Sequence, residues 1–428
     1  MSENPPARAD FRGETPVLAL APLGAADRIV LMDVLRGVAL FGVFLMNVIT
    51  VNSVSVMATE LQLLSLPTAA ADLALHDVFR WLVYDKANSI FAFLFGLGFF
   101  LQMQRLEARG ADFESLYRRR LFVLLGIGLV HMVFFWVWEI LHLYALAGFA
   151  LLALRRLSGR DLLAVGIICA ILGRVTAKTL QQYTGLATWT EPGTRFTDDA
   201  VLARQALSEA GDYFGLVRTF LDLTLFDYVA NGFLVGWFFY ALGRFLVGAW
   251  VGRHGWIARA RQLLPGWQRL MRWTLPPGLV LEGAATLLAE SPLLPEFAHR
   301  GYLAEVAHLV TAPLLATGYV AGLVVLYHGP LGAKLLAPFA WAGRMALTNY
   351  LAQSLVMGFV LFGVGPGLAL AGHIGTCALT GIVIVAFAAQ MLISRWWLGR
   401  YVYGPVEWLW RALTYGHRPP LRLARASR

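Results

Sequence analysis

Polar side chains with reactive groups interrupt the first long apolar segment of the chain, and their spacing places them on one side of a helix. Asp33 and Arg36 are one helical turn apart, so they can form an ion pair. Asn47 lies about 20 Å further along, where its amide can cap a helix or hold a reacting carbonyl group. A charged stripe facing lipid is costly, so this side is expected to face protein or a water-filled cavity. The stripe comprises Asp33, Arg36, Gly37, Leu40, Phe44 and Asn47.

A second group of reactive side chains lies in and before the segment WVWEILHLYA. This segment contains Glu139, His142 and Tyr144, and His131 precedes Glu139 by about two helical turns. An imidazole close to a carboxylate is what a general base and its orienting partner require. The spacing leaves open whether these groups touch, and each histidine is also compatible with a hydrogen bond between two helices.

Isolated charges within other apolar segments allow two interpretations each. Lys86, next to Asp85 and close to Asn88, either lines a site or extends its side chain to the membrane surface. The Asp33–Arg36 pair either neutralises itself near that surface or lines a substrate path.

Glu282 is the most costly single charge, because it lies near the middle of an apolar segment. It needs a partner such as Arg344 or Arg174, or a bound proton. Either state fits a proton path or a structural bridge.

Several common catalytic motifs are absent from the sequence. There is no GxxxxGK[ST], GxSxG or HExxH pattern, so the sequence gives no signal for a nucleotide hydrolase, a serine hydrolase or a zinc protease. Cys169 and Cys377 stand alone within apolar segments, so they are expected to be free thiols, and no metal site is expected.

The composition is that of a membrane protein. Hydrophobic residues make up 58% of the chain and charged residues 14%, with a mean hydropathy of +0.63. Apolar runs of roughly 20 residues recur along the length, which predicts an all-α polytopic integral membrane protein with about ten transmembrane helices. The net charge of +9 is explained by Lys and Arg in cytoplasmic loops, so no nucleic-acid partner is expected.

The distribution of arginines predicts the orientation. A basic loop at residues 105–120 is expected to be cytoplasmic, which places both termini in the cytoplasm and the protein in the cell (inner) membrane. The segment between the two membrane halves is expected either to contain short interfacial helices that form a lid or to be a disordered connector. The predicted organisation is a flexible cytoplasmic tail (1–27), an N-terminal membrane half with helices one to five (28–180), an extracytoplasmic loop (181–225), a C-terminal membrane half (226–400) and a basic cytoplasmic tail (401–428).

The chain resembles the YeiB-like family, also known as domain of unknown function 418. The resemblance lies in RIVLMDVLRGVALFGVFLMN with KANSIFAFLFGLGFFLQ, and in GRMALTNYLAQSL with WWLGRYVYGPVEWLWRALTYG. The first helix is also distantly similar to the transmembrane acyltransferase superfamily, which includes heparan-α-glucosaminide N-acetyltransferase. This similarity implies transfer of an acyl group from cytosolic acyl-CoA, such as acetyl-CoA, to an extracytoplasmic hydroxyl or amine.

Four residues match the superfamily pattern, and one expected residue is missing. Asn47 corresponds to an asparagine that serves catalysis in the acetyltransferase. An essential histidine follows it by eleven positions in that enzyme, where this chain has Ala58. The matching residues are Asp33, Arg36, Gly37 and Asn47.

Another histidine therefore has to act as the base. We expect His131 or His142, oriented by Glu139, to deprotonate the acceptor, while Asn47 holds the carbonyl group. The phosphates of acyl-CoA are expected to bind arginines, whose planar guanidinium groups suit phosphate. The expected partners are the lipid bilayer, a glycan or lipid acceptor, and a second copy of the chain in a homodimer. The expected binding residues are Asp33, Arg36, Lys86, Arg118, Arg119, Arg120, Arg344, Asn349 and Arg411.

Two other functions remain open. A multi-pass transporter or permease for a small metabolite or lipid would use Asp33, Arg36, Glu282 and Arg344 as a substrate or proton path. A non-catalytic membrane scaffold would tolerate substitution of Asp33 and Asn47.

Overall fold

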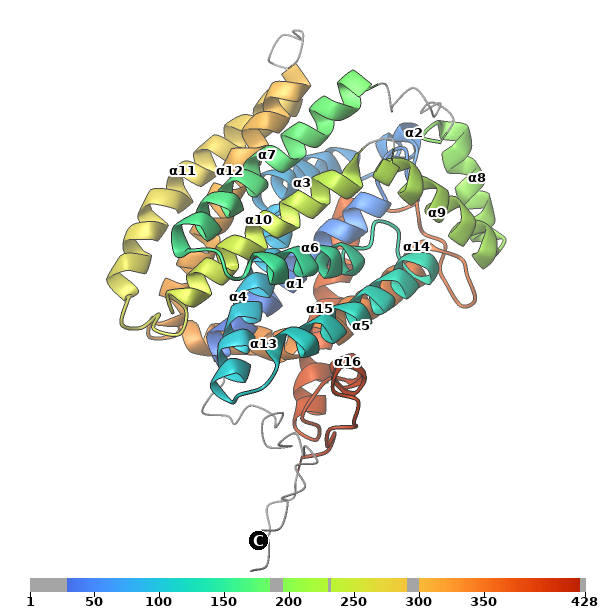
Figure 1. Ribbon diagram of the computed structural model, residues 1–428. Coiled ribbons are helices and arrows are strands. Elements are labelled where there is room, and N and C mark those ends of the chain that lie inside the picture. The colour runs from blue at the N-terminus through green and yellow to red at the C-terminus, as the bar shows by residue number, and fades with distance from the viewer. Residues whose placement is uncertain (1–28, 185–194, 230–231, 291–299, 424–428) are drawn as a thin grey trace, which may run out of the picture.

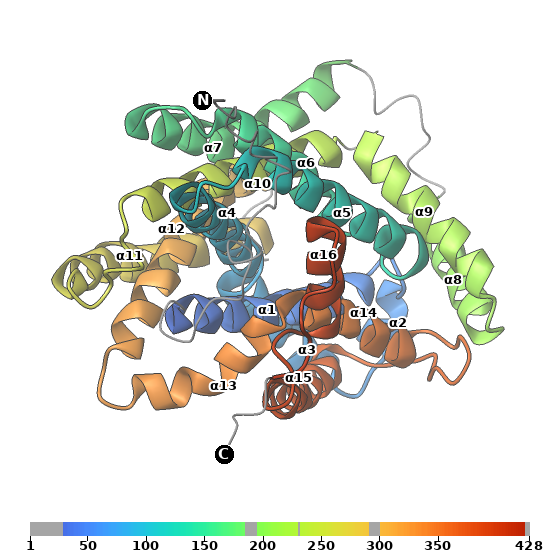
Figure 2. The same cartoon turned by 60° about the horizontal axis from the view of Figure 1, so that its bottom comes forward.

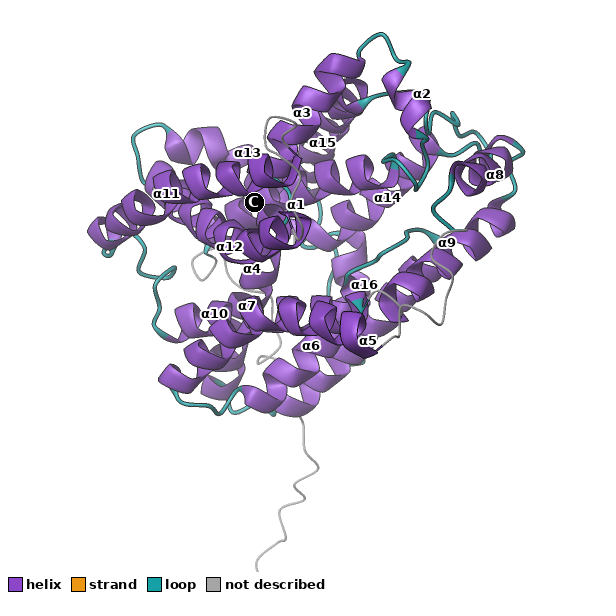
Figure 3. Ribbon diagram, turned by 90° about the horizontal axis from the view of Figure 1, so that it is seen from above, coloured by secondary structure: helices purple, strands orange, loops and turns teal. Residues whose placement is uncertain are grey.

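Helices account for the architecture of the described chain. The computed structural model describes residues 29–184, 195–229, 232–290 and 300–423, and these contain no β-strand (Figures 1 and 3). The predictions for residues 1–27, for the centre of the 181–225 loop and for residues 424–428 lie outside the described part. The helices are α1 (Val30–Val51), α2 (Glu60–Leu64), α3 (Ala69–Leu82), α4 (Lys86–Ala108), α5 (Phe113–Phe134), α6 (Leu141–Leu154), α7 (Gly159–Thr184), α8 (Asp198–Glu209), α9 (Tyr213–Val229), α10 (Phe233–Arg253), α11 (Leu264–Glu290), α12 (Arg300–Tyr327), α13 (Gly332–Arg344), α14 (Ala346–Leu361), α15 (Thr376–Leu398) and α16 (Pro405–Tyr415).

Several of these helices have the length and apolar character of membrane spans. Five segments of the described chain are long and apolar enough to cross a membrane: Val30–Val51, Ala69–Ala108, Phe233–Arg253, Leu303–Tyr327 and Thr376–Leu398. Two further apolar helices, α6 and α14, are shorter. The chain therefore has the character of a helical membrane protein, while the count of about ten spans and the cytoplasmic termini stay predictions.

Helix α1 lies near the centre of the helix assembly and packs against α4, α13, α14 and α15 (Figure 2). Its backbone comes very close to α13, because a Cβ atom at Gly37 would lie 2.0 Å from the Phe339 carbonyl oxygen. Asp33, Gly37 and Phe44 are buried, whereas Asn47 is half-buried. The prediction that the polar stripe of α1 faces protein is thus confirmed for its buried members.

Two predicted helices are broken in the structure. The predicted span over 78–103 is divided into α3 and α4 at Asp85, which has a left-handed φ of 63°, a conformation that interrupts a helix. The predicted helix over 339–362 is divided into α13 and α14 at Met345. The break at Asp85 leaves the buried side chains of Asp85 and Lys86 at the start of α4.

The predicted 181–225 loop contains helix α8 and most of helix α9 (Figure 1), and their position at the membrane surface stays a prediction. Arg204 of α8 donates hydrogen bonds to the carbonyl oxygens of Val56 (2.7 Å) and Ser55 (2.8 Å), just beyond the end of α1. Gln205 of α8 donates to the carbonyl oxygen of Met57 at 2.8 Å. Helix α8 is therefore bonded to the segment that follows α1. Burial lowers the pKa of Arg204 to about 10.

The close approach of α4 and α10 gives a test of the packing. A Cβ atom at Gly96 would lie 1.9 Å from the Phe245 carbonyl oxygen. A Cβ atom at Gly126 would have no neighbouring atom within 4 Å. Gly96→Ala is expected to lower the free energy of unfolding by about 1–3 kcal/mol through overpacking. Gly126→Ala, the matched control, is expected to raise it by about 0.5–1 kcal/mol. Thermal unfolding in detergent measures both, and equal melting temperatures would contradict the packing.

Candidate active site

A buried acid occupies the turn between α5 and α6. The side chain of Glu139 is completely buried. The preceding residue, Trp138, has a φ of 54°, which is rare for a bulky side chain. Its Nε1 donates a 2.7 Å hydrogen bond to Asp227 Oδ2, and the Tyr228 hydroxyl donates to the Glu139 carbonyl oxygen at 3.2 Å. Helix α9 therefore holds the turn that presents Glu139 to the interior.

Hydrogen-bond donors surround the carboxylate. The backbone N–H groups of Leu141 and His142 donate to Oε2 at 2.6 and 3.2 Å. They belong to the first turn of α6, where free N–H groups and the helix dipole favour negative charge. The Tyr350 hydroxyl of α14 donates to Oε1 at 3.2 Å. These contacts explain how an acid is tolerated at a fully buried position.

Both predicted histidines lie against this acid. His142 Nδ1 is 3.3 Å from Glu139 Oε2, and His131 Nδ1 is 3.5 Å from Oε1. Each imidazole is only 3–4% exposed. Because an ionised carboxylate only accepts hydrogen bonds, His142 Nδ1 is assigned the hydrogen, which leaves its Nε2 as an acceptor. His131 Nδ1 faces the same carboxylate but is buried without a hydrogen-bond partner within the described part of the chain. His142 Nε2 is buried and has no hydrogen-bond partner within the described part of the chain.

The structure adds two hydroxyl groups that the sequence analysis missed. His131 Nε2 lies 2.9 Å from Ser354 Oγ, and Tyr350 contacts the acid directly. Ser354 and Tyr350 are both buried and are four residues apart, so they share one face of α14. The four-residue spacing of Tyr350 and Ser354 in the GRMALTNYLAQSL stretch was the sequence feature from which a shared polar face on this helix could have been predicted.

The site is anchored from the other end of α14 by Glu407 of α16. Its carboxylate accepts hydrogen bonds from the N–H groups of Leu347 and Thr348 at 2.7 and 3.0 Å, which satisfies the start of α14. Burial raises the pKa of the Glu407 carboxyl, and the hydrogen bonds from Thr348 oppose that rise. The GPVEWLWRALTYG stretch thus positions the helix that carries Tyr350 and Ser354.

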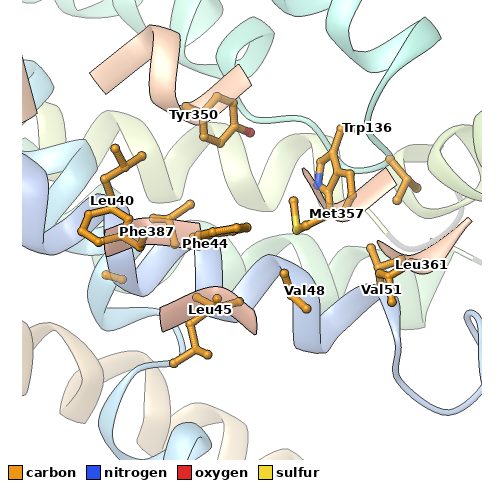
Figure 4. Close-up of a cluster of buried hydrophobic side chains, with 14 of the residues drawn as sticks. Leu40, Phe44, Leu45, Val48, Val51, Trp136, Tyr350, Met357, Leu361 and Phe387 are labelled. Atoms are coloured by element: carbon orange, nitrogen blue, oxygen red, sulfur yellow. The ribbon is translucent and has the colours of Figure 1, made fainter. Parts of the chain in front are cut away.

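Asn47 does not bond to this site. Figure 4 shows its neighbours Phe44 and Val48 packed in one apolar cluster with Met357 and Trp136, the latter next to the Glu139 turn. Asn47 is half-buried, and no hydrogen bond joins its amide to another group in the described ranges. Ala58, at the position of the superfamily histidine, is fully buried under α8 and offers no titratable group.

A second polar network lies between α4, α11 and α12. Lys86 is 1% exposed, and its Nζ donates to Glu282 Oε1 at 2.5 Å and to the Arg80 carbonyl oxygen at 2.8 Å. His308 bridges the network, with Nδ1 2.6 Å from Glu282 Oε1 and Nε2 3.0 Å from Asp85 Oδ2. The Thr311 hydroxyl also donates to Glu282.

This network corrects two sequence-based predictions. Glu282 is paired with Lys86 and His308 and not with Arg344, while the side chain of Arg174 is not among those described. Lys86 does not reach toward the membrane surface. Asn88, predicted to accompany it, points elsewhere and donates to Met46 Sδ at 3.8 Å.

The predicted arginines form a third polar region near the start of α1. Arg36 pairs with Asp33 at 3.2 Å, as predicted. Arg120 stacks on Trp410 of α16, with its Cζ atom 3.8 Å from the ring centroid. Its Nε is buried without a hydrogen-bond partner among the described residues, and Arg411 and Arg36 are among the charged groups that interact with it electrostatically. In the view of Figure 2, α16 is drawn between α1 and α5, and these three helices supply the three arginines.

The remaining predicted binding residues are not part of these clusters. Arg118 and Arg119 are exposed, and Arg344 is half-buried at the end of α13. Asn349 is buried and donates to the Ala342 carbonyl oxygen at 3.1 Å and to Ser394 Oγ at 2.9 Å. Its amide therefore stabilises helix packing. Among the described residues no group of three His, Cys, Asp or Glu side chains could hold a metal ion.

Comparisons with known proteins identify relatives along almost the whole chain. The model of a protein family of unknown function, DUF418, matches residues 251–417, which include Tyr350, Ser354 and Glu407. The uncharacterized protein YxaH of Bacillus subtilis is 31% identical over 93% of this chain and 96% of its own length. The uncharacterized protein YeiB of Escherichia coli is 28% identical over 91% of this chain and 96% of its own length.

The pairing of Glu282 is testable by a double-mutant cycle. Lys86→Met leaves a buried carboxylate without its ammonium partner and is expected to lower the free energy of unfolding by about 3–5 kcal/mol. Adding Glu282→Gln is expected to recover about 1–3 kcal/mol. For the pair Arg344→Met and Glu282→Gln, the two changes in the free energy of unfolding should add within about 0.5 kcal/mol, because the two side chains are not partners. Chemical unfolding in detergent gives these values, and strong coupling to Arg344 instead of Lys86 would contradict the pairing.

Proposed function

The chain belongs to the DUF418 family of YeiB-like proteins, and we propose that it is a membrane-embedded acyltransferase. It moves an acyl group from acyl-CoA in the cytoplasm to a hydroxyl or amine of a glycan or lipid on the outer side of the inner membrane. The observation that carries this proposal is the contact of two buried histidines with one buried carboxylate, Glu139. A carboxylate that orients an imidazole is a common arrangement for proton transfer to and from a hydroxyl or amine.

The acceptor is deprotonated by His142. Its Nδ1 is committed to Glu139, so the lone pair of Nε2 is available to receive a proton. This atom is buried and has no hydrogen-bond partner within the described ranges, which is what a base waiting for a substrate proton requires. Glu139 then stabilises the imidazolium ion that forms. The uncommitted amide of Asn47 binds the acyl oxygen as negative charge develops there.

The donor binds through its phosphates. Arg120 and Arg411 have no ion pair with a carboxylate among the described residues, although they lie close to each other and to Arg36. Grouped guanidinium ions repel each other, and a phosphate monoester or diester relieves this repulsion through paired hydrogen bonds. The exposed Arg118 and Arg119 add attraction for the approaching anion.

The membrane topology belongs to the same proposal. About ten spans with both termini in the cytoplasm put the arginine region on the donor side. The same topology puts the 181–225 loop, with α8 and α9, on the acceptor side. The protein acts as a homodimer in this scheme, and the exposed apolar faces of its helices contact lipid.

A second function is favoured by the network of Lys86, Glu282, His308 and Asp85. Paired ionisable groups in a membrane bundle commonly mark a substrate or proton path. A permease would use this network in place of the Glu139 site.

Kinetics of acyl transfer from acetyl-CoA separate the roles of these groups. Glu139→Gln and His142→Ala are expected to lower kcat by roughly 10²–10⁴-fold, because proton transfer is lost. Arg120→Met is expected to raise the KM for acetyl-CoA with kcat nearly unchanged, because it removes binding common to ground and transition states. The exposed His373 provides the control His373→Ala, which should behave as wild type. If Asn47→Ala, His131→Ala and His142→Ala all retain full activity, the assigned site is wrong.

Transport assays address the second function. Proteoliposomes without acyl donor are expected to show no uptake or efflux of metabolites that co-purify with the protein. Transport that is abolished by Glu282→Gln and retained by His142→Ala would replace the acyltransferase with a permease.

A further inference from the structure

We propose that Ser354 is a nucleophile that carries the acyl group as a serine ester between donor and acceptor. The identity of the donor rests on the proposed acyltransferase function, whereas the nucleophilic character of the serine follows from its own surroundings. Neither the family description nor the relatives assign a role to this residue.

The geometry has the order hydroxyl, imidazole, carboxylate. Ser354 Oγ is 2.9 Å from His131 Nε2, and His131 Nδ1 is 3.5 Å from Glu139 Oε1. With the hydrogen on Nδ1, Nε2 accepts the hydrogen bond that the serine hydroxyl donates. This is the tautomer that lets an imidazole remove the hydroxyl proton. The contact between Nδ1 and Oε1 is too long for a hydrogen bond in this structure, and in the proposed mechanism it tightens when substrate binds, as catalytic hydrogen bonds often do.

The hydroxyl of Ser354 differs from most other hydroxyls in the helices of this protein. Thr224, Thr380 and Thr414 each donate to the carbonyl oxygen four residues earlier in their own helix, at 2.8, 2.6 and 2.7 Å. This bond within a helix is the usual way to satisfy such a group. In the described structure Ser354 instead bonds to an imidazole of another helix, so its proton is already directed toward a base.

Two serines with similar burial show that burial alone does not create this arrangement. Ser394 Oγ accepts a hydrogen bond from Asn349 Nδ2, and Ser89 Oγ lies 2.9 Å from both the Tyr240 hydroxyl and Arg244 Nε. Neither has a histidine or an acid as a hydrogen-bond partner among the described residues. They are internal controls for any reagent that modifies buried serines.

The presence of two histidines on one acid fits two half-reactions. In the first, His131 takes the proton of Ser354, Oγ attacks the thioester carbon, the C–S bond breaks, and the proton passes to the departing thiolate to give CoA thiol. In the second, His142 takes the proton of the acceptor, the acceptor attacks the serine ester, and the C–Oγ bond breaks. The proton that His142 took from the acceptor then passes to Oγ, which restores the Ser354 hydroxyl and leaves both imidazoles neutral.

Burial suits such an intermediate. Ser354 is 3% exposed and Glu139 is not exposed at all. Exclusion of water protects a reactive ester from hydrolysis until the acceptor arrives. It also strengthens the interaction between the imidazolium ion and the carboxylate. In the absence of acceptor the serine ester should therefore accumulate.

The test is acylation of the full-length protein in lipid nanodiscs, with two donors and no acceptor. Acetyl-CoA requires donor recognition, whereas p-nitrophenyl acetate is a small neutral donor that does not depend on the arginines. Peptide mass spectrometry is expected to find one acetyl group on Ser354 with each donor, and none on Ser89 or Ser394. Ser354→Ala should remove the adduct, and so should His131→Ala, which keeps the serine. Ser354→Cys should yield an acetyl thioester that neutral hydroxylamine cleaves.

The outcomes separate this inference from the proposed function. Acetylation of Ser354 by p-nitrophenyl acetate but not by acetyl-CoA supports the nucleophile and contradicts acyl-CoA as the donor. Acyl transfer from acetyl-CoA at the wild-type rate in Ser354→Ala overturns the nucleophile and leaves the acyltransferase, with direct attack by the acceptor. Absence of an adduct on Ser354 with both donors also overturns the nucleophile.

Discussion

Glu139 lies fully buried between α5 and α6, and an acid in that position is tolerated only where several donors converge on it. This requirement connects distant parts of the chain. The first turn of α6 supplies two N–H groups, α5 and α6 each supply a histidine, and α14 supplies the Tyr350 hydroxyl. Helix α9 holds the turn from one side, and Glu407 of α16 holds the start of α14 from the other. The buried acid thus determines where imidazole and hydroxyl groups meet.

Three of the polar regions in the described part of the chain bear on the proposed function. The arginines lie near the start of α1, the Glu139 site lies beside the far half of that helix, and the Lys86–Glu282 network lies between α4, α11 and α12. In an acyltransferase the first region binds the donor phosphates and the second performs proton transfer. The third has all of its charges paired, which suits a structural bridge between α4 and α11. The break at Asp85 makes that bridge possible, because it turns Lys86 inward at the start of α4.

The sequence predicted the helical membrane character, the ion pair of Asp33 with Arg36, and the group of residues around Glu139. These predictions depend on hydrophobicity and on local spacing, which the sequence shows directly. It did not predict the partner of Glu282, because Lys86 lies 196 residues away and a helix can face any of several neighbours. The role of Ser354 was missed for the same reason, since the hydrogen bond joins two residues, Ser354 and His131, that are 223 positions apart in the sequence. The breaks at Asp85 and Met345 escaped prediction because tertiary contacts overrode continuous apolar patterns.

The central claim is that an acyl-CoA molecule reaches the Glu139 site from the arginine region. A cryo-electron microscopy map of the protein with a non-reactive thioether analogue of acetyl-CoA bound tests this most directly. Density is expected for the phosphates against Arg36, Arg120 and Arg411, and for the acyl carbon next to Ser354 Oγ and His142 Nε2. Density with the acyl end beside Glu282, or a map without bound analogue at saturating concentration, would contradict it.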